Sequence, residues 1–463
     1  MNGLLNWIDA RFPATKVWNE HFAQYYAPKN FNFWYFFGSL AIVVLVIQIV
    51  SGIFLTMHYK PDEMLAFQSV EYIMRDVPGG WFIRYMHSTG ASAFFIVIYL
   101  HMFRALIYGS YKGPRELVWL IGMAIYLALM AEAFMGYMLP WGQMSFWGAQ
   151  VIINLFNTVP LIGPELSTWI RGDYVIADAT LNRLFALHVA ALPLVLVGLI
   201  FVHIVALHAV GSNNPDGVDI KKHKDDKGVP LDGIPFHPYY TVKDIVGVSV
   251  FLIFFFAVVF FAPEMGGYFL EHANFEPANP LKTPEHIAPV WYFTPFYTVL
   301  RAVTLSPFAG TAAMFLAIIM LFLLPWIDKN PIRSWRYRNK AHTINILLFV
   351  VAFVILGYLG VKPVTPELKE LGTQMTLVYF LFFLVLWIHS KPATAKYIMW
   401  FVGLTVAIVA MTFYRYNPEA TDDAAQILWQ WSLTVGYLAL TLLLPGLISA
   451  FNTEKDVPER VTG

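Results

Sequence analysis

Residues 81–111 read WFIRYMHSTGASAFFIVIYLHMFRALIYGSY, an apolar stretch of membrane length that carries His87 and His101. In a helix, fourteen positions place the two imidazoles roughly 21 Å apart along the axis and about 40° apart around it. A second apolar stretch, residues 181–210, carries His188 and His203, which a helix separates by roughly 22 Å and about 60°. Two such helices can face each other and offer two stacked pairs of neutral imidazoles.

Histidines paired in this way predict two b-type haems stacked across the bilayer. Haem takes axial ligands from opposite faces of a planar macrocycle, and an apolar sheath tunes its potential. A zinc or copper site needs three or four ligands around one ion, which two distant pairs do not supply. The alternative is that each histidine is a buried polar group satisfied by a neighbouring helix, which accounts for one histidine better than for four arranged two and two.

The composition indicates a polytopic membrane protein. Of 463 residues, 58% are hydrophobic and only 13% are charged, which is too apolar for a water-soluble domain. The formal net charge is zero, so no bulk field favours a nucleic-acid partner. The sequence has no cysteine, which excludes a disulfide framework, a thiolate iron–sulfur cluster and covalent haem attachment within this chain. Any such centre must lie on a partner.

Hydrophobic runs predict about ten membrane-spanning helices, all α. Residues 1–32 contain charges before any long apolar run, so we expect an interfacial amphipathic segment and no cleavable signal peptide. The expected spans are residues 33–57, 81–108, 118–139, 184–210, 246–261, 311–327, 344–360, 375–388, 397–413 and 427–450.

Lys and Arg concentrate in alternate loops, at residues 104–118, 211–246 and 328–344. Since basic loops stay on the cytoplasmic side, the N-terminus is predicted to be cytoplasmic. The second and fourth spans then both run inward. His87 therefore pairs with His188 near the outer face, and His101 pairs with His203 near the inner face.

Glycines on the first and third spans repeat at the histidine interval: Gly38 and Gly52 are fourteen apart, and so are Gly122 and Gly136. Glycine permits the close backbone approach that a macrocycle edge requires, so these four are predicted to contact the haems. The alternative is ordinary helix packing through small residues.

Two arginines lie one turn from histidines at the membrane ends of the second span: Arg84 before His87, and Arg104 after His101. We expect each guanidinium to meet an anionic haem propionate. The alternative is that both arginines snorkel to the interface and only set the orientation of the helix.

Several motifs, together with the histidine pairs, resemble cytochrome b of the quinol:cytochrome c reductase over about residues 30–360. They are AFMGYMLPWGQMSFWGAQVIINLF at 133–156, HAVGSNNPDG at 208–217 and IPFHPYYTVKD at 234–244. A further block, ANPLKTPEHIAPVWYF at 278–293, is similar to the loop that holds the family's Pro-Glu-Trp-Tyr signature.

The resemblance implies a bifurcated reaction that contributes to the proton-motive force in a bacterial inner membrane. Quinol is oxidised at an outer-face site, one electron passes to a Rieske iron–sulfur protein, and the other crosses both haems to reduce quinone at an inner-face site. A c-type cytochrome subunit and a homodimeric complex are also implied. By the same resemblance, the outer haem takes His87 and His188, and the inner haem takes His101 and His203.

The resemblance also implies two sets of quinone-site residues. Those of the oxidation site are Tyr137, Pro289, Trp291 and Tyr292, and those of the reduction site are His208, Ser212, Lys243 and Asp244. Independently, His208 and Asp244 are titratable groups at the cytoplasmic boundary, where they suit proton delivery to a reduced quinone. Without the resemblance, both would be read as solvated loop residues.

One departure from the family pattern concerns proton transfer. Val290 stands where the signature has a glutamate, so the carboxylate expected to accept a quinol proton is missing. Glu132, inside the otherwise apolar third span, is the predicted substitute, because an unpaired carboxylate there is the usual mark of a proton relay. The alternative is a carboxyl paired to a neighbouring helix.

A second departure is length, since the family usually ends after eight helices. Three apolar runs follow residue 361 here, and the sequence leaves open whether the first or the last corresponds to the family's eighth helix. The expected division is an interfacial segment (1–32), a dihaem four-helix bundle (33–215), a cytoplasmic loop (216–245), quinol-site helices with an outer loop (246–360), additional spans (361–450) and a polar, disordered tail (451–463).

Two other classes of function remain open from the residues alone. A dihaem membrane anchor would relay electrons between a peripheral dehydrogenase and quinone, but it leaves the outer Pro-Val-Trp-Tyr loop without a role. A haem-free transporter would use intramembrane histidines to couple protons, and it predicts no visible absorbance.

Overall fold

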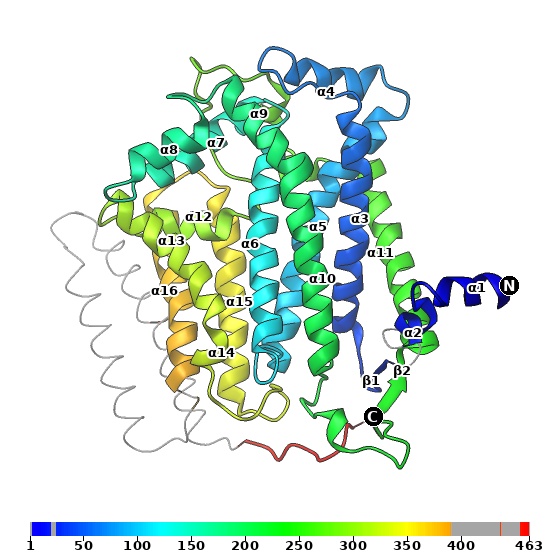
Figure 1. Ribbon diagram of the computed structural model, residues 1–463. Helices are drawn as coiled ribbons and strands as arrows, with labels where there is room; N and C mark the ends of the chain where they lie inside the picture. Colours follow the sequence, from blue (N-terminus) through cyan, green and yellow to red (C-terminus); the bar gives the residue numbers. More distant parts are fainter. Residues whose placement is uncertain (1, 20–24, 389, 391–435, 437–453, 463) are drawn as a thin grey trace.

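The computed structural model describes residues 2–19, 25–388, 390, 436 and 454–462. Long helices lie side by side through the described part, and shorter helices cover the end opposite residues 454–462 (Figure 1). One small antiparallel sheet pairs β1 (Tyr26–Pro28) with β2 (Gly233–Pro235). The all-α membrane fold expected from the sequence is confirmed.

Four long helices form the bundle that carries the histidines. They are α3 (Phe36–Thr56), α5 (Gly80–Tyr108), α6 (Glu116–Met138) and α10 (Leu192–Val210). The fourth member begins earlier, as α9 (Asp178–Ala186), and passes through a π-helical turn, η3 (Leu187–Ala191), before α10. Helix α3 packs along α5, and α6 packs along α10, so the two histidine-bearing helices each lie against a glycine-bearing one.

The C-terminal helices form a second group beside α6 (Figure 1). This group comprises α12 (Thr294–Ala302), α13 (Pro307–Phe322), α14 (Leu324–Ile327), α15 (Lys340–Gly360) and α16 (Pro366–Ile388). Helix α11 (Thr241–Phe261) instead packs on α3 and α5. One apolar cluster runs from α5 and α6 into α15 and α16, with Tyr126 and Phe349 among its buried members. Side-chain packing thereby joins the two groups.

Seven helices of the described residues are long and apolar enough to cross a membrane. The expected span 311–327 differs, because it is divided into the 16-residue α13 and the 4-residue α14. Pro325 explains the break, since proline cannot donate the backbone hydrogen bond that would continue α13. The expected span 375–388 begins earlier, at Pro366 in α16. The expected spans 397–413 and 427–450 lie outside the described residues.

Three short amphipathic helices were not predicted from the sequence. They lie at the end of the molecule opposite residues 454–462 (Figure 1), namely α4 (Ala66–Arg75), α7 (Gln143–Asn157) and α8 (Gly163–Arg171). Two further short helices, α1 (Asn2–Asp9) and α2 (Ala14–Trp18), form the N-terminal segment. Their exposed Leu4, Trp7 and Trp18 fit the expected interfacial segment.

The polar tail was expected to be disordered, and for residues 454–462 this expectation is wrong. The Arg460 guanidinium donates two hydrogen bonds to Asp232, at 2.7 and 3.0 Å. The backbone and hydroxyl of Thr462 donate to Asp216, at 2.9 and 2.8 Å. Both aspartates are almost fully buried, and a buried carboxylate is costly without such partners. The hydrogen bonds that these two buried carboxylates accept therefore hold the tail in an ordered position.

Candidate functional site

His87 on α5 faces His188 in the π-helical turn η3. Their ring centres lie 6.2 Å apart, with the ring planes at 89° to each other. Two imidazoles whose nitrogens each lie about 2 Å from one metal ion have ring centres about 6 Å apart. The gap between the two rings therefore matches axial ligation of one iron.

Each ring of this pair is oriented by a partner on its Nδ1 atom. His87 Nδ1 lies 2.9 Å from the Ser51 hydroxyl on α3. His188 Nδ1 lies 2.9 Å from the carbonyl oxygen of Glu132 and 3.1 Å from its Oε1 atom. With both Nδ1 atoms engaged, Nε2 is left on each ring to bind iron. A metal-bound histidine typically has this arrangement, in which the other ring nitrogen donates to a carbonyl or carboxylate.

The π-helical turn η3 explains how the two histidines of the fourth span can face those on α5, although the spacing between the histidines differs by one residue. Histidines are fourteen apart on α5 but fifteen apart between η3 and α10. A π turn accommodates one extra residue within a helix, and here it contains His188 itself. Pro193 follows directly, near the start of α10. The π turn thus accommodates the extra residue around His188, and the two histidines of the fourth span stay in register with those on α5.

The four glycines lie against the four histidine rings. A Cβ atom at Gly52 would lie 3.3 Å from the His87 ring, one at Gly38 would lie 3.5 Å from the His101 ring, and one at Gly122 would lie 3.2 Å from the His203 ring. At Gly136, a Cβ atom would overlap the His188 ring. The sequence predicted close approach at these positions. In the structure, the atoms nearest to a Cβ at these four glycines are those of the imidazole rings, whereas the prediction expected the edge of a haem macrocycle.

A cavity of about 610 Å³ lies at the outer pair. Its walls include both imidazoles and Arg84, and it continues to Tyr137, Val290 and Tyr292. This volume is typical of a site for a cofactor or a small molecule. One continuous space therefore joins the outer histidines to residues that the sequence assigned to quinol oxidation.

The inner pair is His101 on α5 and His203 on α10, which are close enough to interact electrostatically. Arg104 Nη2 lies 3.5 Å from His101 Nδ1, and the guanidinium lies 4.8 Å from the centre of the Tyr35 ring. The Arg104 Nε atom is buried and has no hydrogen-bond partner among the described residues. A buried cation with an unused donor fits an anionic group such as a haem propionate.

Glu132 was expected to be an unpaired carboxylate in the membrane. Its Oε1 atom instead lies beside His188 Nδ1 on the neighbouring helix. For this oxygen, the observed contact is the alternative expected from the sequence, a carboxyl paired to a neighbouring helix. Glu132 lines the cavity, and its buried Oε2 atom has no partner in the described part of the chain. The observed geometry assigns Glu132 to the support of His188.

Two of the four residues expected at the oxidation site, Tyr137 and Tyr292, line the cavity. Val290 also lines it, and Tyr292 stacks on Phe95 at 3.9 Å between ring centres. Trp291 is not among the lining residues, but its indole nitrogen donates at 3.1 Å to the hydroxyl of Ser92, which is. Pro289 is half-buried and is not among the residues lining the cavity.

Glu271 is a residue of this region that the sequence reading missed. The Tyr137 hydroxyl donates to its Oε2 atom at 2.6 Å. Burial raises the pKa of Glu271 to about 7, although the hydrogen bond from Tyr137 opposes the shift. No motif marks this position, because it lies in an irregular loop eighteen residues before Pro289.

The expected reduction-site residues fall into two places at the inner end. Tyr25, which the sequence reading also missed, joins two of them, since its ring stacks on His208 at 4.4 Å and its hydroxyl lies 3.0 Å from Ser212 Oγ. The other two begin α11. Lys243 lies 5.2 Å from the centre of the Tyr240 ring, and Asp244 lies beside Ser39.

The membrane-length helices and stacked histidine pairs define an integral membrane protein of the haem-binding class. Two family models match, described as "Cytochrome b/b6/petB" over residues 22–211 and "Cytochrome b(C-terminal)/b6/petD" over residues 277–380. The chain therefore belongs to the cytochrome b family. The second match ends inside α16, so α16, the first of the three C-terminal runs, corresponds to the last helix that the family model covers.

Relatives and solved structures agree with this assignment. The chain is 61% identical to "Cytochrome b" of Allochromatium vinosum over 399 residues, which is 85% of this chain and 96% of the relative. It is 50% identical to "Cytochrome b" of Rickettsia prowazekii, over 86% of this chain and 95% of the relative. A chain of "Hyperthermophilic respiratory Complex III" superposes with a TM-score of 0.77 at 39% identity, covering 83% of this chain and 98% of that one.

Proposed function

We propose that this chain is the dihaem subunit of a bacterial quinol:cytochrome c oxidoreductase, a complex III-like assembly. The observation that carries the proposal is the cavity that joins an iron-spaced histidine pair to the residues of the outer loop. A protein that only relays electrons needs no such space beside its outer metal site.

Four imidazoles would hold the two haems. His87 and His188 would ligate the outer haem, and His101 and His203 the inner haem, with Arg84 and Arg104 placed to receive propionates. When bound, the haems supply one-electron transfer across the membrane. The chain itself orients the ligand rings through Ser51 and Glu132, and the apolar helices exclude water around them.

Quinol would enter at the outer end of the cavity and be oxidised against Tyr137 and Tyr292. One electron would leave to a Rieske iron–sulfur protein and a c-type cytochrome subunit. The other would pass to the inner haem, where quinone would be reduced near Ser212 and Lys243, with His208 and Asp244 supplying protons. The N-terminus would be cytoplasmic, the complex homodimeric, and the reaction would contribute to the proton-motive force.

The test is a redox titration of the haem α-band in membranes that contain the assembled complex. We expect two b-type components in the unaltered chain, with His87→Ala or His188→Ala removing one and His101→Ala or His203→Ala removing the other. Quinol-dependent reduction of cytochrome c should be lost in all four variants. A colourless chain after reduction, or loss of one and the same component in all four variants, contradicts the proposal.

A further inference from the structure

Glu271 and Tyr137 form a hydrogen-bonded pair at the outer end of the cavity. Tyr137 lines the cavity, and its hydroxyl donates to the half-buried Glu271 carboxylate at 2.6 Å. Leu270, the residue before Glu271, is also part of the lining. The carboxylate is therefore connected to the cavity by one tyrosine hydroxyl.

The loop that carries Glu271 is attached to the segment that follows Tyr137. The Asn274 amide donates to Ser145 Oγ at 3.0 Å and accepts from the Ser145 backbone at 2.9 Å. The Gln143 backbone donates to the Glu276 carbonyl at 3.0 Å. Ser145 in turn donates to the Tyr137 carbonyl. These bonds fix the loop relative to Tyr137 and bring the Glu271 carboxylate within reach of the tyrosine hydroxyl.

No carboxylate among the described residues lining the cavity is free of a partner. Of the described residues lining the cavity, Glu132 is the one acidic side chain, and its Oε1 atom is engaged by His188. Val290, which stands where the family signature has glutamate, lines the cavity but cannot accept a proton. A proton leaving a molecule in the outer part of the cavity thus meets Tyr137 and, behind it, Glu271.

We propose that Glu271 accepts the first proton of quinol oxidation in this chain, with Tyr137 holding its carboxylate in place. The inference rests on the proposed function, since it needs quinol in the cavity. One quinol O–H bond breaks, its proton moves to the Glu271 carboxylate, and quinol becomes its monoanion. The two electrons would then leave, one to the outer haem and one to the iron–sulfur partner of the proposed function, and the second proton would leave with the latter electron.

The acidity of Glu271 suits this step, because a general base works best when its pKa is near the working pH. Burial raises the pKa of Glu271 to about 7. About one tenth of the carboxyls are then ionised at pH 6 and about nine tenths at pH 8. The rate of quinol oxidation should accordingly rise with pH across this interval.

The experiment compares Glu271→Gln with Glu276→Gln, an exposed glutamate of the same loop, in the assembled complex. For Glu271→Gln we expect an unchanged haem spectrum, a kcat for cytochrome c reduction about 100-fold lower, and loss of the rise between pH 6 and pH 8. Glu276→Gln should stay within about twofold of the unaltered complex. An unchanged kcat with the rise retained in Glu271→Gln overturns the inference.

A second variant decides the matter if Glu271→Gln does not assemble. The hydrogen bond from Tyr137 lowers the pKa of Glu271, so Tyr137→Phe should move the rise in rate to higher pH. A rise that stays in place overturns the inference. Failure of the proposed function has a different signature, since the unaltered complex would then lack b-type absorbance or quinol-dependent activity altogether.

Discussion

His188 is held by a neighbouring carboxylate, whereas the Nδ1 atom of its partner His87 meets the hydroxyl of Ser51. A carboxylate on the far nitrogen of a ligating imidazole fixes the ring orientation and makes the ligand more basic. The Glu132 carbonyl also accepts from the same Nδ1 atom, at 2.9 Å. Two acceptors from one residue therefore converge on one ring nitrogen. At the scale of single residues, Glu132 is a positioning residue for His188, the proposed ligand of the outer haem.

This role predicts different results for two substitutions of Glu132. Glu132→Leu removes the side-chain acceptor but leaves the carbonyl, so haem should bind at the outer site about 10-fold more weakly and its midpoint potential should shift. Glu132→Gln keeps an acceptor oxygen of nearly the same shape and should retain the outer haem. The measurement is the amplitude and midpoint of the α-band in a redox titration. Equal losses in both variants would contradict the positioning role.

Individual residues also show how far the sequence could lead. Histidine spacing predicted both pairs, because helical geometry is regular over fourteen residues and an ionisable group in a membrane span is conspicuous. Glu271 could not be found in this way. It lies in an irregular loop whose position depends on bonds between Asn274 and Ser145, which are distant in the sequence. Tyr25 was missed for the same reason, since its contacts with His208 and Ser212 cross almost the whole N-terminal half.

Among the elements, the long spans were predicted well and the irregular ones were not. Apolar runs gave α3, α5, α6, α11 and α15 within a few residues. The π turn before α10 has no characteristic amino-acid composition, so no sequence pattern marks it. The tail at residues 454–462 is polar throughout, so local composition indicates disorder. Its order comes from Asp216 and Asp232, which lie more than 200 positions earlier.

The docked tail predicts a specific effect of Arg460→Ala. Arg460 is exposed and its charged hydrogen bonds are partly screened by solvent, so their loss should make amide hydrogen exchange in residues 454–462 faster by only a small factor. Glu459→Gln, a change at an exposed neighbour, is the matched control. Hydrogen exchange followed by mass spectrometry measures both. Unchanged exchange in Arg460→Ala would mean that other contacts hold the tail.

The same contact has a pH dependence with a defined sign. The Arg460 guanidinium lowers the pKa of Asp232 to about 2, whereas an unfolded aspartate has a pKa of about 3.9. Because the folded value is the lower one, the stabilisation is fully present above about pH 4 and is lost as the pH falls through about 2. The protection of the tail amides, which is their exchange rate compared with that of an unstructured peptide at the same pH, should therefore decrease in that interval. In Arg460→Ala the decrease should begin at higher pH.

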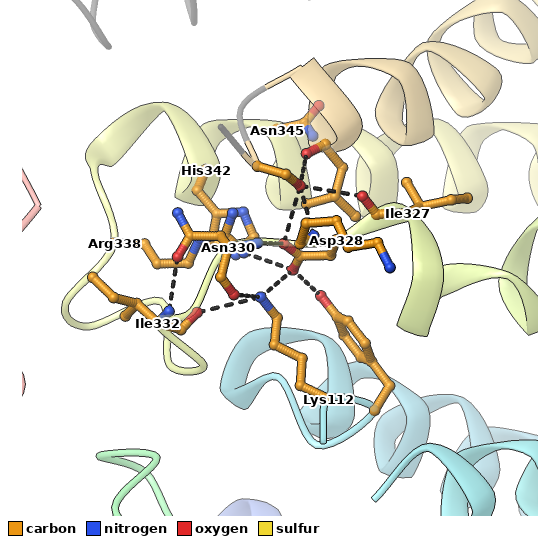
Figure 2. A network of polar contacts seen from close by, with 12 residues as sticks. Lys112, Ile327, Asp328, Asn330, Ile332, Arg338, His342 and Asn345 are labelled. Atoms are coloured by element: carbon orange, nitrogen blue, oxygen red, sulfur yellow. Dashed lines mark hydrogen bonds and ion pairs between the residues drawn. The ribbon is translucent and has the colours of Figure 1, made fainter. Parts of the chain in front are cut away.

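At the scale of the whole molecule, one buried network joins the part matched by the first family model to the part matched by the second. Figure 2 shows Asp328, which follows α14, at the centre of this network. Its Oδ2 atom lies 2.8 Å from Lys112 Nζ and 2.7 Å from Arg338 Nη1, and it accepts from the Tyr111 hydroxyl at 2.6 Å. Lys112 also donates to the Asn330 carbonyl. The loop between α5 and α6 is thereby fixed to the segment before α15.

Charge balance explains why this network is stable although it is buried. Burial alone would raise the pKa of Asp328, but the Arg338 guanidinium and the Lys112 ammonium hold it well below its usual value. Burial lowers the pKa of Lys112 to about 8, against the opposing effect of Asp328. Lys112 and Asp328 therefore each stabilise the charged form of the other.

Asp328→Asn should consequently destabilise the whole protein, because it leaves the Lys112 and Arg338 charges buried without a counter-ion. Breaking a buried ion pair from one side typically costs about 3–5 kcal/mol, so we expect a marked fall in the unfolding temperature of the detergent-solubilised complex. Asp226→Asn, in an exposed loop, is the control and should leave the temperature unchanged. Since both histidine pairs lie within the first matched part, haem absorbance per folded molecule should persist in Asp328→Asn. Loss of haem without a fall in unfolding temperature would show that the network supports the haem sites and does not join the two parts.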